Sequence, residues 1–419
     1  MAEQTVDVVV SLDGEDVLAG RLFSHRRGNE GSASFSYASS YVARDDSYAL
    51  DPTLPLKQGA LQTPVGLPMF GAFADAAPDR WGRALITRAE RRRASAEDAP
   101  PRSIGETDFL LGVHDDLRQG AIRFRDPVTD TFLAGEDGGV PQLTDLRVLL
   151  QAADHLEADE ETEVELRQLL RAGSSLGGAR PKAHVIDGAG RLAIAKFPRA
   201  QHDTWNVMAW EKVSLDLARE ARIRVPDSQL LRISDRSVLI VDRFDRIGAR
   251  RIGYASAMTM VEGRDHDVGS YLDIGAVIEQ TSRHASDDLR ELWRRIAFSI
   301  LISNTDDHLR NHGFLREVGA WRLSPAFDIN PDPAPGPKQL STAIDGYSTE
   351  ASIDVLMSVA ELFRLTDADA LTVLREVVMV TSRWRLVAET HGLSETEIAE
   401  MAWAFEHTQT DSARALEKA

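Results

Sequence analysis

A short polar stretch, Asn304-Thr-Asp-Asp-His-Leu-Arg-Asn311, carries the side chains of this sequence that are best suited to chemistry. A further carboxylate, Asp328 in Ser-Pro-Ala-Phe-Asp-Ile, follows seventeen residues after Asn311. In phosphoryl transfer from ATP, one carboxylate accepts the proton of the attacking hydroxyl, while an amide and a second carboxylate hold magnesium against the phosphates. We therefore predict Asp306 as the catalytic or positioning carboxylate, and Asn311 and Asp328 as hard oxygen ligands of Mg²⁺.

The same cluster permits two other interpretations. Asn and Asp favour turns and helix N-caps, so the stretch could be a capped turn with no chemistry. The aspartates, together with His308 and His312, could instead hold the metal of a hydrolase, although no spacing matches a zinc motif. His308 could also order the loop by hydrogen bonding, or face solvent.

Two upstream segments favour phosphoryl transfer. Residues 173–182, Gly-Ser-Ser-Leu-Gly-Gly-Ala-Arg-Pro-Lys, form a glycine-rich loop whose backbone N–H groups could approach phosphates, although the P-loop spacing is absent and a plain turn is equally consistent. Lys196 lies on the apolar stretch 192–197, where a lysine is uncommon unless it meets an anion. Kinases place such a lysine on the α- and β-phosphates, whereas an edge-strand lysine would extend to solvent.

The stretch Asp242-Arg-Phe-Asp-Arg246 ends a predicted strand. Its backbone could meet an adenine edge, with Asp245 near the ribose; a surface charge cluster is the alternative. Glu211, on a helix that begins near Trp205, could pair with Lys196, and a solvated glutamate is equally consistent.

The elements that must position these residues fall into three predicted domains, 1–125, 140–265 and 266–419. Period-two alternation predicts strands at 6–12, 17–23 and 33–38, and Pro78 marks the start of a helix. We predict an exposed loop at 94–101, a linker at 126–139 and helix over 143–172. Strands are predicted at 184–186, 192–197, 229–233 and 237–244. From about residue 268 the pattern is mainly helical, interrupted by polar loops at 303–313 and 328–347.

This order predicts an α+β fold: a small α+β N-terminal domain, then a two-lobed, protein-kinase-like core with a small sheet-containing lobe and a helical C-terminal lobe. The 419 residues include no cysteine, which excludes disulfides and thiolate chemistry. No apolar run reaches a membrane span, and no secretion signal is visible, so a cytoplasmic location without membrane contact is expected. The formal net charge of −18 disfavours direct DNA binding, and Arg91-Arg92-Arg93 is more typical of a solvated helix face than of a DNA contact.

The chain resembles the HipA family, the serine/threonine kinase toxins of bacterial type II toxin–antitoxin pairs. The resemblance rests on residues 174–182, Ala195-Lys-Phe-Pro198, Asp242-Arg-Phe-Asp-Arg246, 305–311 and Pro325-Ala-Phe-Asp-Ile329. The stretches Leu54-Pro-Leu and Ala77-Pro-Asp-Arg80 look like the small domain that precedes the kinase core.

The resemblance implies a role for each matching residue. It implies that Lys196 binds ATP phosphates, that Asp306 is catalytic, and that Asn311 and Asp328 bind Mg²⁺. It also implies that Asp242 and Phe244 meet adenine through their backbones, and we predict Asp245, Gly177, Gly178 and His308 as further nucleotide-binding residues. Ser175 aligns with the serine that family members autophosphorylate, and the adjacent Ser174 could substitute. Phosphate there adds about −1.5 to −2 charge beside the ATP site and would inactivate the kinase.

The resemblance also implies partners. The target would be a translation component such as an aminoacyl-tRNA synthetase, and the inhibitor a small helix-turn-helix, HipB-like antitoxin that supplies the contact with DNA. The alternative is a non-catalytic nucleotide-binding corepressor that works with a DNA-binding antitoxin.

Overall fold

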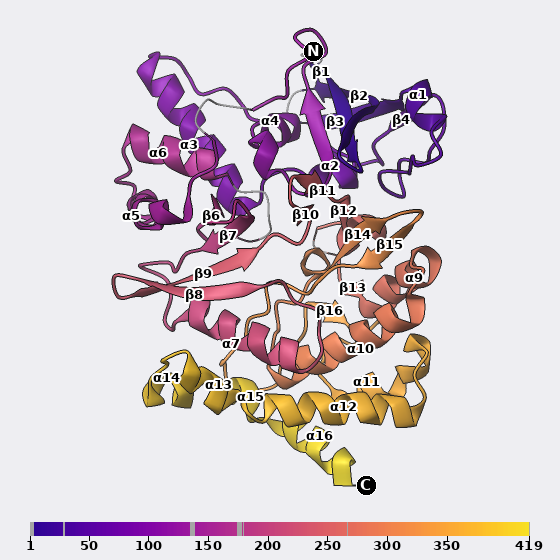
Figure 1. The fold of residues 1–419 in the computed structure, drawn as a ribbon, viewed down its shortest axis with the longest axis vertical. Coiled ribbons are helices and arrows are strands. Elements are labelled where there is room, and N and C mark those ends of the chain that lie inside the picture. Colours follow the sequence, from indigo (N-terminus) through magenta and orange to yellow (C-terminus); the bar gives the residue numbers. More distant parts are fainter. Residues whose placement is uncertain are drawn as a thin grey trace. The chain divides into compact units, whose positions relative to one another are not determined.

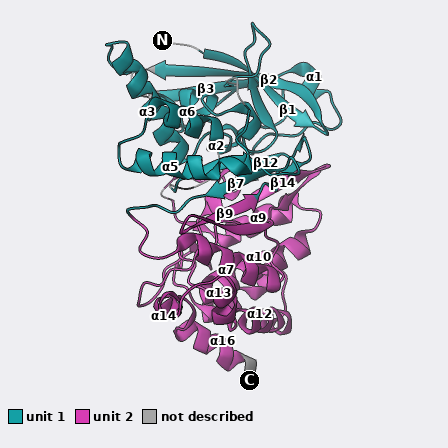
Figure 2. Ribbon diagram, turned by 60° about the vertical axis from the view of Figure 1, so that its left-hand side comes forward, with its two compact units in different colours: residues 1–201, 242–255 teal, residues 202–241, 256–419 magenta. Residues whose placement is uncertain are grey.

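The computed structural model describes residues 4–27, 30–134, 139–173, 178, 180–265 and 267–418. Figure 1 shows the order of its helices and strands, and Figure 2 shows the two compact units into which the chain divides. Unit 1 consists of residues 1–201 and 242–255, and unit 2 of residues 202–241 and 256–419. Within the described residues, no helix is both long and apolar enough to cross a membrane.

A five-stranded antiparallel sheet with the order β4-β3-β2-β1-β5 begins unit 1. Its strands are β1 Gln4–Leu12, β2 Glu15–Arg27, β3 Glu30–Tyr37, β4 Ala60–Gln62 and β5 Ile122–Arg125. Phe73 packs edge-on against Phe35, Phe70 and Phe124 with ring centroids 5.5–5.8 Å apart, so aromatic burial holds the sheet to its helices. Gly20 is required where β2 meets β3, because a Cβ there would lie 2.3 Å from the Ser36 carbonyl oxygen.

The helices of unit 1 are α1 Ser39–Val42, α2 Gly71–Asp75, α3 Arg80–Ala96, α4 Glu106–Leu111, α5 Leu146–Glu157 and α6 Glu163–Ala172, with short 3-10 turns η1 Asp115–Leu117 and η2 Leu143–Asp145. The predicted helix at 143–172 is therefore two helices. The predicted loop at 94–101 begins later than expected, because α3 continues to Ala96. Arg92 and Arg93 pair with Glu161 and Glu90, so two of the three arginines in that basic run serve the fold.

Short strands complete unit 1. They are β6 Lys182–Ile186 and β7 Leu192–Lys196, which pair antiparallel, and the small hairpin of β10 Arg246–Ile247 and β11 Arg250–Arg251. The strands predicted at 184–186 and 192–197 are thus present. β12, Tyr254–Ser256, begins in unit 1 and ends at Ser256, where the chain enters unit 2 again.

Unit 2 is mainly helical. Its helices are α7 Val207–Glu220, α8 Ala257–Met260, α9 Tyr271–Thr281, α10 Ala285–Leu301, α11 Ile353–Ser358, α12 Asp367–Thr381, α13 Trp384–Thr390, α14 Glu395–Glu400, α15 Ala402–Phe405 and α16 Thr408–Lys418, with 3-10 turns η3 Leu309–Asn311 and η4 Ala360–Phe363. Its strands are β8 Ser228–Ile233, β9 Arg236–Asp242, β13 Gly269–Ser270, β14 Gly313–Glu317, β15 Ala320–Leu323 and β16 Thr342–Ala343.

The central helix of unit 2 is α10, whose C-terminal half is buried all round and ends at the polar stretch. Immediately after that stretch, β14 and β15 form an antiparallel hairpin with Phe314 opposite Leu323. The sequence did not predict this hairpin, because the apolar Phe314 and Leu315 are adjacent and do not alternate with polar residues. The mixture of sheets and helices confirms the predicted α+β class.

Candidate active site

The turn that presents Asp306 is built on the end of α10. The Asn304 N–H donates to the Ser299 carbonyl at 2.8 Å, and Asn304 Oδ1 accepts from the Asn330 N–H at 3.2 Å. Ser303 has a left-handed backbone with φ 54° and donates its hydroxyl to the Ala404 carbonyl. These bonds reverse the chain sharply, so that Asp306 is exposed only five residues beyond the buried helix.

Asp307, the neighbour of Asp306, points the other way into the core. Its Oδ2 accepts hydrogen bonds from the Tyr271 hydroxyl at 2.6 Å and the Ser299 hydroxyl at 3.2 Å. His312 Nε2 lies 3.0 Å from Oδ1, out of line with the ring N–H, so this contact is mainly electrostatic. Burial alone would raise the pKa of Asp307, but His312 and the two hydroxyls outweigh it and hold the pKa below its usual value.

The backbone carbonyl of Asp306 is fixed from two sides. The His308 N–H and the Asn311 side-chain Nδ2 both donate to it at 2.9 Å. The side-chain nitrogen of Asn311 is therefore used in a hydrogen bond within the protein, which leaves Oδ1 as the atom that can coordinate a cation. His308 is half-buried and contributes a backbone bond to this turn.

Asp328 lies on the segment after β15 and is half-buried. Its backbone is left-handed, with φ 58°, a conformation that costs a non-glycine residue about 1–3 kcal/mol and persists where the surroundings impose it. The flanking residues Ala326, Phe327 and Ile329 line one pocket together with Asn304, Asp307 and Asn311. Unit 2 thus brings the polar loop and the Asp328 segment to one place.

Asn311 lines this pocket, and Asp328 lies in the chain between two of its lining residues, Phe327 and Ile329. Asn311 Oδ1 and the Asp328 carboxylate are hard oxygen donors, which magnesium combines with water and substrate phosphates. Among the described residues, no three His, Asp or Glu side chains are placed to hold a metal by themselves. A site that takes its remaining ligands from a nucleotide fits this donor set better than the metal centre of a hydrolase.

The predicted phosphate-binding residues lie in unit 1. Lys196 ends β7 and is half-buried, with Lys182 of β6 directly opposite in the antiparallel register. Gly178 has φ 107°, which a residue with a side chain rarely adopts. Ser174, Ser175 and Gly177 lie outside the described residues.

The structure gives Asp245 a different environment from the one predicted. Its side chain is 2% exposed, and its oxygens bond to Arg243 at 2.6–2.7 Å, to Arg246 at 2.8 Å and to the Gly120 N–H at 2.7 Å. With both oxygens bonded inside unit 1, this carboxylate is not presented to a ribose. The surface-cluster alternative is also wrong for Arg243 and Asp245, because both are buried.

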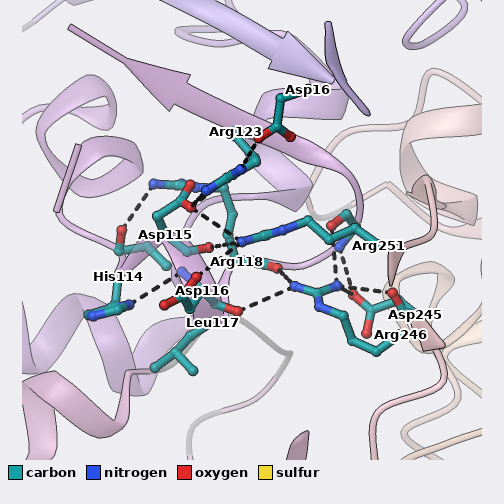
Figure 3. Close-up of polar contacts among 12 residues, drawn as sticks. Asp16, His114, Asp115, Asp116, Leu117, Arg118, Arg123, Asp245, Arg246 and Arg251 are labelled. Atoms are coloured by element: carbon teal, nitrogen blue, oxygen red, sulfur yellow. Dashed lines mark hydrogen bonds and ion pairs between the residues drawn. The ribbon is translucent and has the colours of Figure 1, made fainter. Parts of the chain in front are cut away.

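Asp245 belongs to a larger ionic cluster that joins the 242–251 segment to residues 114–123 (Figure 3). Arg246 Nη2 donates to the Arg118 carbonyl at 2.6 Å, and Arg251 Nη2 donates to the Asp115 carbonyl at 2.8 Å. Burial lowers the pKa of Arg246 to about 9, with the neighbouring arginines adding to the effect against the pull of Asp245. This cluster is a structural support.

Asp242 and Phe244, the other predicted nucleotide-binding residues of the 242–246 stretch, are more accessible than Asp245. Asp242 is half-buried and lies 3.1 Å from the Arg191 guanidinium. The half-buried Phe244 ring contacts Tyr254 at 6.3 Å between centroids. Both backbones remain candidates for the predicted adenine contact. Glu211 is 2% exposed, so the solvated alternative for this glutamate is wrong.

Sequence reasoning missed Asp307 and Tyr271 as supports of the loop. The available signal was the Asp306-Asp307 doublet itself. Adjacent side chains in a turn usually point apart, so one of the two carboxylates is directed into the protein and needs hydrogen-bond partners there. Tyr271, thirty-six residues away, gives no such local signal.

Comparison with known proteins identifies the family of the chain. Residues 174–384, half of the chain, match the HipA-like C-terminal domain, and residues 10–102 match the HipA N-terminal domain. The chain belongs to the HipA family. The predicted family is therefore confirmed over both its N-terminal and its C-terminal domain.

A HipA fold is also seen in solved structures. A chain of the Shewanella oneidensis MR-1 toxin–antitoxin complex of HipA, HipB and operator DNA is similar with a TM-score of 0.64 and 14% identity, over 99% of both chains. This likeness confirms the predicted fold. The Helicobacter pylori proinflammatory kinase CtkA is similar with a TM-score of 0.45 and 16% identity, over 58% of this chain and 93% of its own.

Among curated proteins, Putative kinase Y4dM of Sinorhizobium fredii is 32% identical over 161 residues. The match spans 34% of this chain and 38% of Y4dM, so this chain covers well under half of that relative.

Proposed function

We propose that this HipA-family chain is an ATP- and Mg²⁺-dependent protein serine/threonine kinase that acts as the toxin of a toxin–antitoxin pair. The observation that carries the proposal is the arrangement in unit 2: one exposed carboxylate, Asp306, on a turn held by buried groups, next to Asn311 and the Asp328 segment on a shared pocket. Such an arrangement suits a group that must meet a substrate hydroxyl while its support stays fixed.

In the proposed reaction, the Asp306 carboxylate accepts the proton of a serine or threonine hydroxyl as its oxygen bonds to the γ-phosphorus. The bond between the γ-phosphorus and the β,γ-bridging oxygen breaks, and ADP leaves with that oxygen. Lys196 binds the α- and β-phosphates, with Gly177 and Gly178 approaching them through backbone N–H groups, and His308 orders the catalytic turn. Asn311 and Asp328 would hold Mg²⁺, which would neutralise phosphate charge. The backbones of Asp242 and Phe244 meet the adenine.

Regulation and partners are part of the same proposal. Autophosphorylation of Ser175, or of the adjacent Ser174, inactivates the kinase by placing negative charge beside the nucleotide phosphates. The acidic chain reaches DNA through a small helix-turn-helix antitoxin, a view supported by the HipA–HipB–operator complex to which its fold is similar. The phosphorylated target is proposed to be a translation component such as an aminoacyl-tRNA synthetase.

The test is Asp306→Ala, expressed without an antitoxin. Removal of the proton acceptor should abolish growth arrest and reduce phosphate transfer from radiolabelled ATP by about 10²–10⁴-fold. The purified wild type should carry phosphate on Ser175 or Ser174 by mass spectrometry, and the variant should carry none.

Two outcomes would separate the alternatives. A variant as toxic and as active as wild type would exclude Asp306 as the catalytic residue. Wild type that binds ATP without transferring phosphate to any protein would instead favour the non-catalytic corepressor.

A further inference from the structure

The last residue of the glycine-rich loop is held by a helix about a hundred positions earlier in the sequence. Lys182 Nζ lies 2.6 Å from Asp79 Oδ2, and the Trp81 indole Nε1 donates to the Lys182 carbonyl at 3.1 Å. Asp79 and Trp81 lie at the start of α3, in the part of the chain that matches the HipA N-terminal domain. Both the side chain and the backbone of Lys182 are therefore fixed by α3.

The Asp79 carboxylate makes two connections at once. Its Oδ1 accepts from the Gly82 N–H at 2.9 Å and caps α3, while Oδ2 meets Lys182. A carboxylate at a helix N-terminus is also favoured by the helix dipole. The side chains of Asp79 and Lys182 are only 5% and 3% exposed. Loss of either charge would therefore leave the other charge buried beside a neutral group, which is costly.

Lys182 is close to both predicted phosphate-binding features of unit 1. It faces Lys196 directly across the β6–β7 pair, where two like charges repel unless one is compensated. A Cβ placed on Gly178 would lie 3.3 Å from Lys182 Nζ, so Gly178 lies close to this ammonium group. Asp79 therefore neutralises the lysine that the protein buries, while Lys196, half-buried at the end of β7, is the one proposed to bind phosphate.

The other end of the loop rests on the same part of the chain. Gly173 has φ 60°, and a Cβ there would lie 2.5 Å from Leu117 Cδ1, so only glycine fits between the end of α6 and η1. The preceding carbonyl, that of Ala172, contacts His184 Nδ1 at 3.1 Å. Residues before position 125 thus contact both ends of the 173–182 stretch.

We propose that Asp79 is a positioning residue for nucleotide binding, and that α3 of the N-terminal domain clamps Lys182 at the start of β6, opposite Lys196. The ligand is the triphosphate of a nucleotide such as ATP, so this role rests on the proposed function. Asp79 acts through Lys182 and touches no nucleotide itself.

The test compares Asp79→Asn with wild type in the full-length chain. Asparagine keeps the size and the capping oxygen and removes the charge, so α3 stays capped while Lys182 loses its counter-ion. The dissociation constant of a fluorescent ATP analogue should rise by about tenfold or more, because a broken buried ion pair is costly. The maximal rate of phosphate transfer at saturating ATP should fall much less. Backbone hydrogen exchange over Lys182–Ile186, measured without nucleotide, should accelerate.

Two further variants distinguish a clamp from general damage. Asp98→Asn makes the same change at an exposed site just beyond the other end of α3 and should bind ATP as wild type does. In a Lys182→Met background, Asp79→Asn should add no further loss of affinity, because the pair it would break is already gone.

Each outcome decides a separate point. Wild type that binds no nucleotide overturns the proposed function, and the role of Asp79 with it. Wild type that binds while Asp79→Asn binds equally well overturns the clamp alone. The clamp is also overturned if Asp79→Asn weakens binding as much in the Lys182→Met background as in the chain that retains Lys182.

Discussion

The Asp306 turn in unit 2 and the 242–251 segment in unit 1 look alike as sequence, since both are dense in charge and both follow a buried element. In the structure they differ in where the charges end up. At 242–251 every oxygen of the Asp245 carboxylate is bonded to buried groups of the protein. At the Asp306 turn, Asp307 takes the buried position and Asp306 is left exposed. Under the proposed function, the motif that carries the chemistry is the one whose buried neighbours support an exposed carboxylate.

The largest effect expected from this contrast is on stability. Asp245→Asn leaves Arg243 and Arg246 buried without their counter-ion, so the free energy of unfolding should fall by about 3–5 kcal/mol. Asp306→Asn removes the same charge from an exposed position and should change stability by only about 0.5 kcal/mol. Urea unfolding of both variants measures the difference. Equal losses in the two variants would show that burial does not separate the two motifs.

A smaller effect is expected at the support of the catalytic turn. Asp307→Asn keeps an acceptor for Tyr271 and loses the attraction to His312, so stability should fall by about 1–3 kcal/mol. Because Asp307 fixes the turn, phosphate transfer should fall by up to about 10²-fold, the usual cost of a small misplacement of a reacting group. Tyr271→Phe, which removes one hydrogen bond to Asp307, should show a weaker loss of both. If stability falls and the transfer rate does not, Asp307 supports the fold alone.

A dependence of stability on pH is also expected in unit 1, and it is smallest close to neutral pH. His184 donates from Nδ1 to a carbonyl and accepts at Nε2 from Arg243, and burial, together with Arg243, lowers its pKa to about 3. The unfolded chain protonates this histidine near pH 6.5 and so binds more protons than the folded chain below that pH. Stability should therefore fall as the pH drops from about 6.5 towards about 3, by up to about 1.4 kcal/mol per pH unit.

His184→Gln offers a matched test, since glutamine can donate and accept at the same place without titrating. Denaturant unfolding across this pH range should give a flatter profile for the variant than for wild type. An unchanged slope would mean that other groups dominate the acid sensitivity of unit 1.

The same contrast explains what the sequence could and could not predict. Alternation identified β1, β2 and β3, and the polar stretch after an apolar helix identified the Asp306 turn, because both signals are local. The burial of Asp245 depends on its contacts with Gly120 and Arg246 in the folded chain. Gly120 is distant in sequence, so the pattern of residues around Asp245 could not predict whether this carboxylate faces a ribose or the protein. The burial of Glu211 was undecidable from sequence for the same reason. The β14–β15 hairpin was missed because Phe314 and Leu315 are adjacent, which hides the alternation of β14.

The backbone of Asp328 carries a consequence for the evolution of this chain. A left-handed conformation suits glycine and costs aspartate, so stability and the proposed magnesium-binding role favour different residues at this position. While selection acts on phosphate transfer, the aspartate is retained at that cost. A gene copy released from this selection would gain stability by exchanging Asp328 for glycine, so glycine at this position in an otherwise intact relative would identify a chain that has abandoned catalysis and kept its fold.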